Sequence, residues 1–259
     1  MKIVKNNLFR ISGFLIVLTI STICFAQPYL ATKVGTKLCY DEVIDSKQNV
    51  VVEEVLSSEN RDGKVFVVTN MISGKDTIKM RKEIQGNDYF YNPVEGIYET
   101  MIDKGVEEAI KDAKKDGEEF TTEQINELQD KLRAKLKISG KSALYPENMK
   151  VGDKLPESKI KLKILLFSMK SYIEDREVIK EEDVTTSAGT FHCICLSQRE
   201  IMKALGNKSD QVVEYYLAKN IGIVKSIARE DGKVVGTTTL SSIDWVKPVE
   251  KVISNTPNK

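Results

Sequence analysis

The chain has 259 residues, of which 39 are Lys or Arg and 38 are Asp or Glu, so its formal net charge is only +1. This balance provides no basic surface for nucleic acid or for an anionic membrane, and we expect neither as a partner. The length is sufficient for one large or two small domains, and we expect a single antiparallel β domain over residues 27–246.

The first 26 residues have the pattern of a secretory signal peptide. Lys2, Lys5 and Arg10 precede an apolar run over 11–23, and the small residue Ala26 closes the segment. The run is shorter than the roughly 20 apolar residues of a membrane helix. We therefore expect residues 1–26 to be removed and the mature chain to be periplasmic or extracellular, soluble or peripherally attached, with no transmembrane span. A lipoprotein interpretation would instead keep Cys24 as the lipidated residue.

The next part of the chain favours short β-strands joined by turns. Residues 36–56 predict a hairpin with a polar connection at 45–49, and strands are expected at 64–72, 77–84 and 88–91. The paired acids Glu53 and Glu54 are interpreted as solvated surface residues. The aromatic residues Tyr89, Phe90, Tyr91 and Tyr98 are candidates for a ligand-binding surface, although alternating aromatics in a strand more often belong to the core.

The stretch from 101 to about 141 is charged, lacks proline and predicts a helical insertion. Thr121 and Gln124 form a candidate capping box, and apolar residues at three- and four-residue steps follow it to about residue 137. The insertion could be an arm that binds a partner or a membrane surface. The simpler alternative is a helical pair that covers one opening or edge of the sheet.

The C-terminal part again favours strands, which we expect at 159–167, 171–178, 191–198, 212–217, 222–229 and 234–243. Both faces of 191–198 are largely apolar, which predicts a strand buried on both sides. Residues 247–259 form a polar tail. The fold class is therefore mainly β, with a curved antiparallel sheet or half-barrel and an α-helical insertion.

The candidate reactive residues are few. Export permits a disulfide between Cys39 and Cys193, or between Cys39 and Cys195, but three buried thiols are an equal alternative. No metal site is expected, because the C-x-C pair has no second Cys or His pair. The single histidine, His192, has no acid near it in sequence, and its strand position directs it away from Cys193, so no catalytic residue is assigned.

Two strings carry a resemblance to a known group. Ser187-Ala188-Gly189-Thr190-Phe191-His192-Cys193 and the run over 213–226, preceded by Tyr145-Pro146 and Val151-Gly152-Asp153, resemble the TapB-like family of exported bacterial proteins, a domain of unknown function. The resemblance spans about 36–243. It implies a curved antiparallel sheet, similar to the open half-barrels of lipoprotein carriers, and it implies no catalytic residue and no cofactor.

Two functions follow as hypotheses. The first is an exported, non-enzymatic protein that binds an apolar ligand, a lipid or a lipidated partner in the concave face of the sheet. The second is a structural or assembly factor that binds other envelope proteins through the helical insertion or a sheet edge. A hydrolase that uses His192 is a distant third.

Overall fold

The computed structural model describes residues 27–245, apart from 116, 118, 165–166 and 205. The predicted signal peptide over 1–26, including Cys24, and the predicted tail over 247–259 lie outside the described residues. The described residues form thirteen strands and two helices in the order β1 Lys37–Ile44, β2 Lys47–Arg61, β3 Lys64–Ser73, β4 Asp76–Gln85, β5 Asp88–Tyr91, α1 Pro93–Lys115, α2 Thr122–Ala134, β6 Leu136–Lys141, β7 Ala143–Tyr145, β8 Ser158–Ile164, β9 Phe167–Thr186, β10 Gly189–Ala204, β11 Asn207–Ala218, β12 Gly222–Glu230 and β13 Lys233–Asp244.

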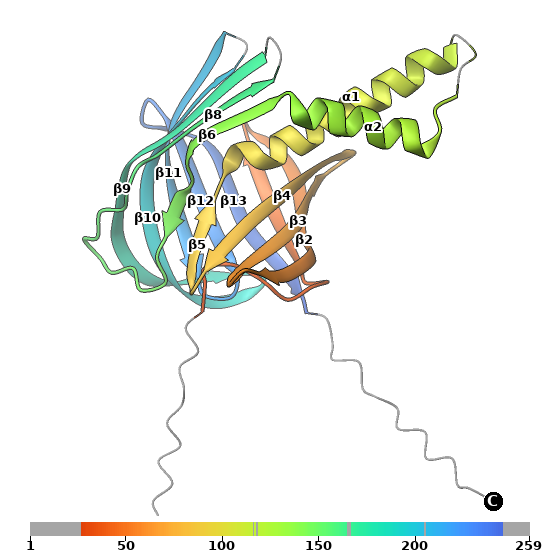
Figure 1. The fold of residues 1–259 in the computed structure, drawn as a ribbon. Helices are drawn as coiled ribbons and strands as arrows, with labels where there is room; N and C mark the ends of the chain where they lie inside the picture. The colour runs from red at the N-terminus through yellow and green to blue at the C-terminus, as the bar shows by residue number, and fades with distance from the viewer. Residues whose placement is uncertain (1–26, 116, 118, 165–166, 205, 246–259) are drawn as a thin grey trace, which may run out of the picture.

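All thirteen strands belong to one antiparallel sheet that curves into a nearly closed barrel shape (Figure 1). Across the sheet the strands follow the order β6-β8-β9-β10-β11-β12-β13-β1-β2-β3-β4-β5-β7. The predicted mainly β fold with a curved antiparallel sheet and a helical insertion is confirmed. The curvature goes further than a half-barrel, because the two edges of the sheet come together.

The edges meet through a single residue. β6 pairs with β8 at one edge and β7 pairs with β5 at the other, yet only Ser142 separates β6 from β7 in the chain. Gly140 makes the β6–β8 pairing possible, because its φ is +120° and a Cβ there would lie 1.8 Å from the carbonyl oxygen of Lys159. The chain itself therefore joins the first and last strands of the sheet.

Short turns set much of the register. Asp45 and Ser46 connect β1 to β2 with φ values of 47° and 66°, so the connection is tighter than the predicted break over 45–49. Asp62 and Gly63 connect β2 to β3 with φ values of 52° and 76°. Two successive positive φ values match the right-handed twist of a hairpin, which explains the Asp-Gly signal in the sequence.

The helical segment differs from the prediction at both boundaries. α1 begins at Pro93 rather than near residue 101, which agrees with the preference of proline for the first turn of a helix. The capping box is confirmed: the Thr121 hydroxyl accepts from the Gln124 backbone N–H at 3.2 Å, and the Gln124 side-chain oxygen accepts from the Thr121 backbone N–H at 2.9 Å. α2 ends at Ala134, and residues 136–141 form β6 instead of continuing the helix.

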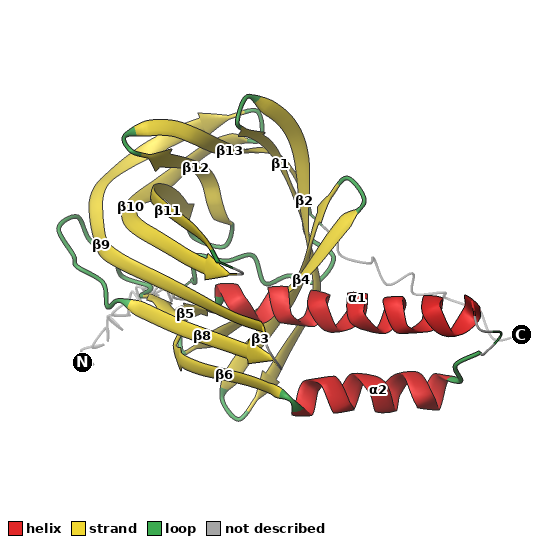
Figure 2. Ribbon diagram, turned by 90° about the horizontal axis from the view of Figure 1, so that it is seen from above, coloured by secondary structure: helices red, strands yellow, loops and turns green. Residues whose placement is uncertain are grey.

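The two helices lie side by side and project past β4 when the molecule is viewed from above (Figure 2). Ile102 and Val106 of α1 are buried, whereas α2 contains no buried residue. Part of α1 therefore packs on the sheet, and α2 extends away from it. Binding of a partner or a membrane surface by this insertion stays a prediction. Within the described residues, neither helix has the length and apolar character needed to cross a membrane.

Candidate functional site

A cavity of about 260 Å³ lies inside the curved sheet. Strands β1 to β5, β7 and β11 to β13 supply most of its wall. Its lining is mainly apolar and aromatic, which is typical of small-molecule sites. The residues that line it are Tyr29, Leu30, Tyr40, Glu42, Val51, Glu53, Met71, Met80, Lys82, Tyr89, Tyr91, Tyr145, Tyr215, Leu217, Ile221, Gly222, Ile223, Ser226 and Thr238.

Tyrosine rings form one side of this cavity. Tyr89 stacks on Tyr145 with ring centroids 5.1 Å apart and an interplanar angle of 24°, and Tyr91 lies 6.3 Å from Tyr89 in a tilted arrangement. Burial raises the pKa of Tyr89 and of Tyr91 well above the ordinary phenol value, so both hydroxyls remain protonated at neutral pH. The wall therefore combines apolar ring faces with neutral groups that can donate or accept a hydrogen bond.

The four aromatic residues singled out in the sequence do not form one surface. Tyr89 and Tyr91 face the cavity, whereas Phe90 lies on the opposite face of β5 and lines a surface hollow with Phe66 and Arg81. This follows from the alternation of side chains along a strand. Tyr98 belongs to α1, and its side chain lies outside the described residues.

A buried ion pair projects into the same cavity. Lys82 of β4 donates from Nζ to Oε1 of Glu53 of β2, and the two side chains are only 9% and 11% exposed. The interpretation of Glu53 as a solvated acid was wrong. Glu53 shares the interior face of β2 with Val51 and Val55, both buried, while Glu54 faces the other way and pairs with Lys37.

A second polar network supports the tyrosine wall from behind. The buried Arg176 donates from Nε to Gln198 at 3.0 Å and from Nη1 to the carbonyl oxygen of Pro156 at 2.8 Å. The guanidinium also lies 4.7 Å from the ring centroid of Tyr145. These contacts give the Nε and Nη1 atoms of the buried guanidinium hydrogen-bond partners. They also hold the ring of Tyr145 against Tyr89.

A second hollow of about 260 Å³ adjoins the cavity and shares Glu42, Tyr215, Ser226 and Thr238 with it. We call it the acidic vestibule, because its lining includes the four carboxylates of Glu42, Asp45, Glu200 and Glu230 and, among its described residues, no Lys or Arg. Glu200 accepts a hydrogen bond from the Tyr215 hydroxyl at 2.9 Å. Charges of one sign therefore line the hollow that adjoins the cavity.

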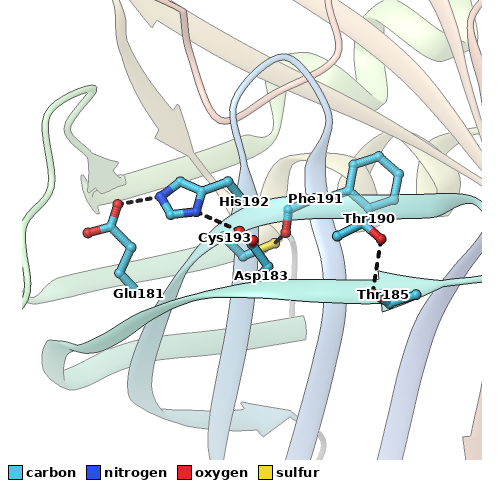
Figure 3. A network of polar contacts seen from close by, with 7 residues as sticks. All are labelled: Glu181, Asp183, Thr185, Thr190, Phe191, His192 and Cys193. Atoms are coloured by element: carbon cyan, nitrogen blue, oxygen red, sulfur yellow. Dashed lines mark hydrogen bonds and ion pairs between the residues drawn. The ribbon is translucent and has the colours of Figure 1, made fainter.

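His192 lies outside the cavity, on an exposed part of β10 (Figure 3). Its Nδ1 is 2.8 Å from Oδ1 of Asp183 and its Nε2 is 2.7 Å from Oε1 of Glu181, both on β9. These hydrogen bonds, first to Asp183 and then to Glu181, raise the pKa of His192. These two contacts were not predicted from the sequence, because Asp183 and Glu181 become cross-strand neighbours of His192 only when β9 pairs with β10.

The three cysteines among the described residues, Cys39, Cys193 and Cys195, are free thiols. Cys193 is buried in the core with Val224 and Leu240, whereas Cys39 alternates with the buried Leu38 and Tyr40 and so lies on the other face of β1. The predicted pairing of Cys39 with Cys193 is therefore not formed. Burial raises the pKa of Cys193 to about 12 and that of Cys195 to about 11.

The chemistry that these residues offer is limited. The Cys193 thiol donates to the carbonyl oxygen of Phe191 at 3.4 Å and lies on the other side of β10 from the His192 ring, so the two do not form a nucleophilic pair (Figure 3). In the described part of the chain, no group of three or more Cys, His, Asp or Glu residues is arranged to hold a metal ion. The cavity, with its tyrosine wall and buried ion pair, is the best-formed candidate site.

Two solved structures have a similar fold. An inferred exported protein with a YmcC-like fold from Bacteroides fragilis has a TM-score of 0.58 and 17% identity, with 85% of this chain and 100% of that chain covered. An inferred lipoprotein from Parabacteroides distasonis has a TM-score of 0.57 and 14% identity, with coverage of 84% and 99%. At these identities the likeness concerns the fold alone.

No curated protein matches the chain. The family comparison identifies a DUF3108-like domain over residues 95–240, a stretch that contains both strings behind the TapB-like resemblance, although the TapB-like name itself is not confirmed. The match covers more than half of the sequence, from α1 into β13. The chain therefore belongs to the DUF3108-like family.

Proposed function

We propose that this protein is an exported, non-enzymatic binding protein that holds an apolar ligand or the lipid group of a modified partner in the interior cavity. The observation that carries the proposal is the cavity itself, which is enclosed by the curved sheet and lined mainly by apolar and tyrosine side chains. A volume of about 260 Å³ approaches the lower end of the roughly 300–1,000 Å³ of ligand pockets, so one narrow apolar group suits it better than a bulky one.

Export is supported by two independent observations. The first 26 residues combine a basic start with a short apolar run. The two solved structures of similar fold are described as an inferred exported protein and an inferred lipoprotein. We place the protein in the periplasm or outside the cell, with or without attachment through Cys24.

The test is native mass spectrometry of the full chain isolated from the cell envelope, followed by lipid extraction. We expect a bound small apolar molecule of defined mass. A matched pair of variants tests the location: Met71→Trp adds bulk inside the cavity, whereas Phe66→Trp adds bulk on the outward face of the same strand. Loss of the bound mass in the first variant alone supports the proposal, and a ligand-free wild-type protein contradicts it.

The helical arm favours a second candidate function, binding of another envelope protein. The apolar residues Ile125, Leu128 and Leu132 of α2 are only half-buried against α1, and α2 projects away from the sheet (Figure 1). Leu128→Gln should abolish crosslinking to a specific partner, whereas Glu127→Gln, on the exposed face, should not. Equal crosslinking by both variants would exclude this stripe as the contact.

A further inference from the structure

The ion pair inside the cavity restricts what kind of head group a ligand can carry. Lys82 and Glu53 are both buried and balance one another, so the buried charged groups of the cavity form a dipole with no net charge. The third charged residue of the lining, Glu42, is only half-buried and adds a carboxylate. We infer that the cavity selects a single-chain amphiphile with an uncharged head that both donates and accepts hydrogen bonds, such as an alcohol or an amide, and rejects the carboxylate of a free fatty acid. This inference rests on the proposed function.

The hydrogen-bonding capacity of the Lys82–Glu53 pair explains why an uncharged head group is preferred. Lys82 Nζ carries three N–H donors, one of which is donated to Glu53, and a carboxylate such as that of Glu53 can only accept. A hydroxyl can accept from Lys82 and donate to Glu53 at the same time. A ligand carboxylate cannot donate to Glu53, and it would add a second negative charge beside Glu53 in a buried site.

The acidic vestibule also disfavours an anionic ligand. Any anion that approaches the cavity from this side passes the carboxylates of Glu42, Asp45, Glu200 and Glu230, with no basic residue among the described lining. Repulsion by like charges raises the free energy of an anionic ligand along this path and slows its association. An uncharged head does not experience this repulsion.

The remaining wall suits a narrow apolar tail. Val51 and Met71 from one side of the sheet, and Leu217 and Ile221 from the other, line the cavity together with the ring of Tyr89. Such a surface gains free energy from the burial of methylene groups and offers no partner for a second charge. The ligand class is therefore defined by a short polar end beside Lys82 and a tail against these side chains.

Isothermal titration calorimetry of the delipidated full chain with octanol, octanoate and octylamine at neutral pH tests this inference. The three probes share one tail and differ only in the head. We expect octanol to bind and octanoate to bind at least about tenfold more weakly. Octanoate that binds as tightly as octanol, or octylamine that binds more tightly, would overturn the inference while leaving the proposed function in place; no binding by any probe would overturn both.

A double variant tests the role of the ion pair without leaving an unpaired buried charge. In Lys82→Met/Glu53→Met, the preference of octanol over octanoate should fall to less than about threefold, because only the vestibule still discriminates. The control Lys64→Met/Glu83→Met removes an outward pair of the same residue types, 2.8 Å apart, and should keep the full preference. An unchanged preference in the first double variant would show that the ion pair does not select the head group.

Discussion

Removal of one partner of the buried ion pair should cost a large part of the stability of the protein. In Lys82→Met, the Glu53 carboxylate would remain buried on the interior face of β2 without its cation. Breaking a buried pair in this way typically costs about 3–5 kcal/mol, which is a large fraction of the roughly 5–15 kcal/mol of a folded domain. Both side chains are about nine-tenths buried, so screening by solvent reduces this value little.

Urea unfolding followed by far-UV circular dichroism measures the effect. With an m-value of about 2–3 kcal/mol/M, the midpoint of Lys82→Met should fall by about 1–2 M. Lys82→Met/Glu53→Met should recover most of this loss, because replacement of a whole buried pair by apolar side chains is often neutral or stabilising. The half-exposed pair Lys64–Glu83 on the outward face contributes at most about 1 kcal/mol, so its removal serves as the control. If Lys82→Met unfolded at the same urea concentration as the wild-type protein, the reasoning that the Lys82–Glu53 pair is desolvated would be refuted.

Three further predictions concern other parts of the fold. Gly140→Ala should destabilise the protein by about 1–3 kcal/mol and speed amide exchange in β6, because the new Cβ would meet a backbone carbonyl of β8; unchanged exchange would contradict the tight approach. Cys193 and Cys195, whose pKa values are raised by burial, should react with iodoacetamide only after unfolding; labelling of the native protein at pH 8 would contradict their burial. NMR titration should give His192 a pKa above about 6.5, and Asp183→Asn should lower it. Because the folded pKa is raised, the contribution of His192 to stability is present below its ordinary pKa and is lost as the pH rises through the folded value.

Much of the fold is encoded in local signals. The Asp62-Gly63 turn and the Asp231-Gly232 turn each provide the two positive φ values that join neighbouring strands. The capping box of Thr121 locates the start of α2 within one residue. Such features depend only on neighbours in the chain, so the sequence was sufficient to predict them.

The closure of the sheet could not be predicted in the same way. Leu136 continues the helical spacing of α2, which is why 136–141 resembled the end of a helix. Pairing of this segment with β8 outweighs its local preference, and that partner lies about twenty residues away in sequence. The meeting of β6 and β7 at Ser142 depends on the curvature of the whole sheet, for which no single stretch of sequence carries a signal.

The candidate site was predicted only in part. Tyr89 and Tyr91 attracted attention as alternating aromatics, and both line the cavity. Glu53 was interpreted as an ordinary surface charge and Lys82 was not singled out, because a strand that alternates charged and apolar residues usually turns the charges to solvent. They are recognisable as a pair only when β3 aligns β2 with β4.

Photolabelling with an alkyl diazirine tests the central claim, that the interior cavity binds apolar groups, most directly. The full chain is irradiated with the probe, digested, and mapped by mass spectrometry, with and without excess octanol as competitor. The account predicts adducts on the peptides of Tyr89, Tyr91 and Tyr145 that octanol suppresses. Adducts confined to the half-buried stripe of α2, or adducts that octanol does not suppress, would contradict it.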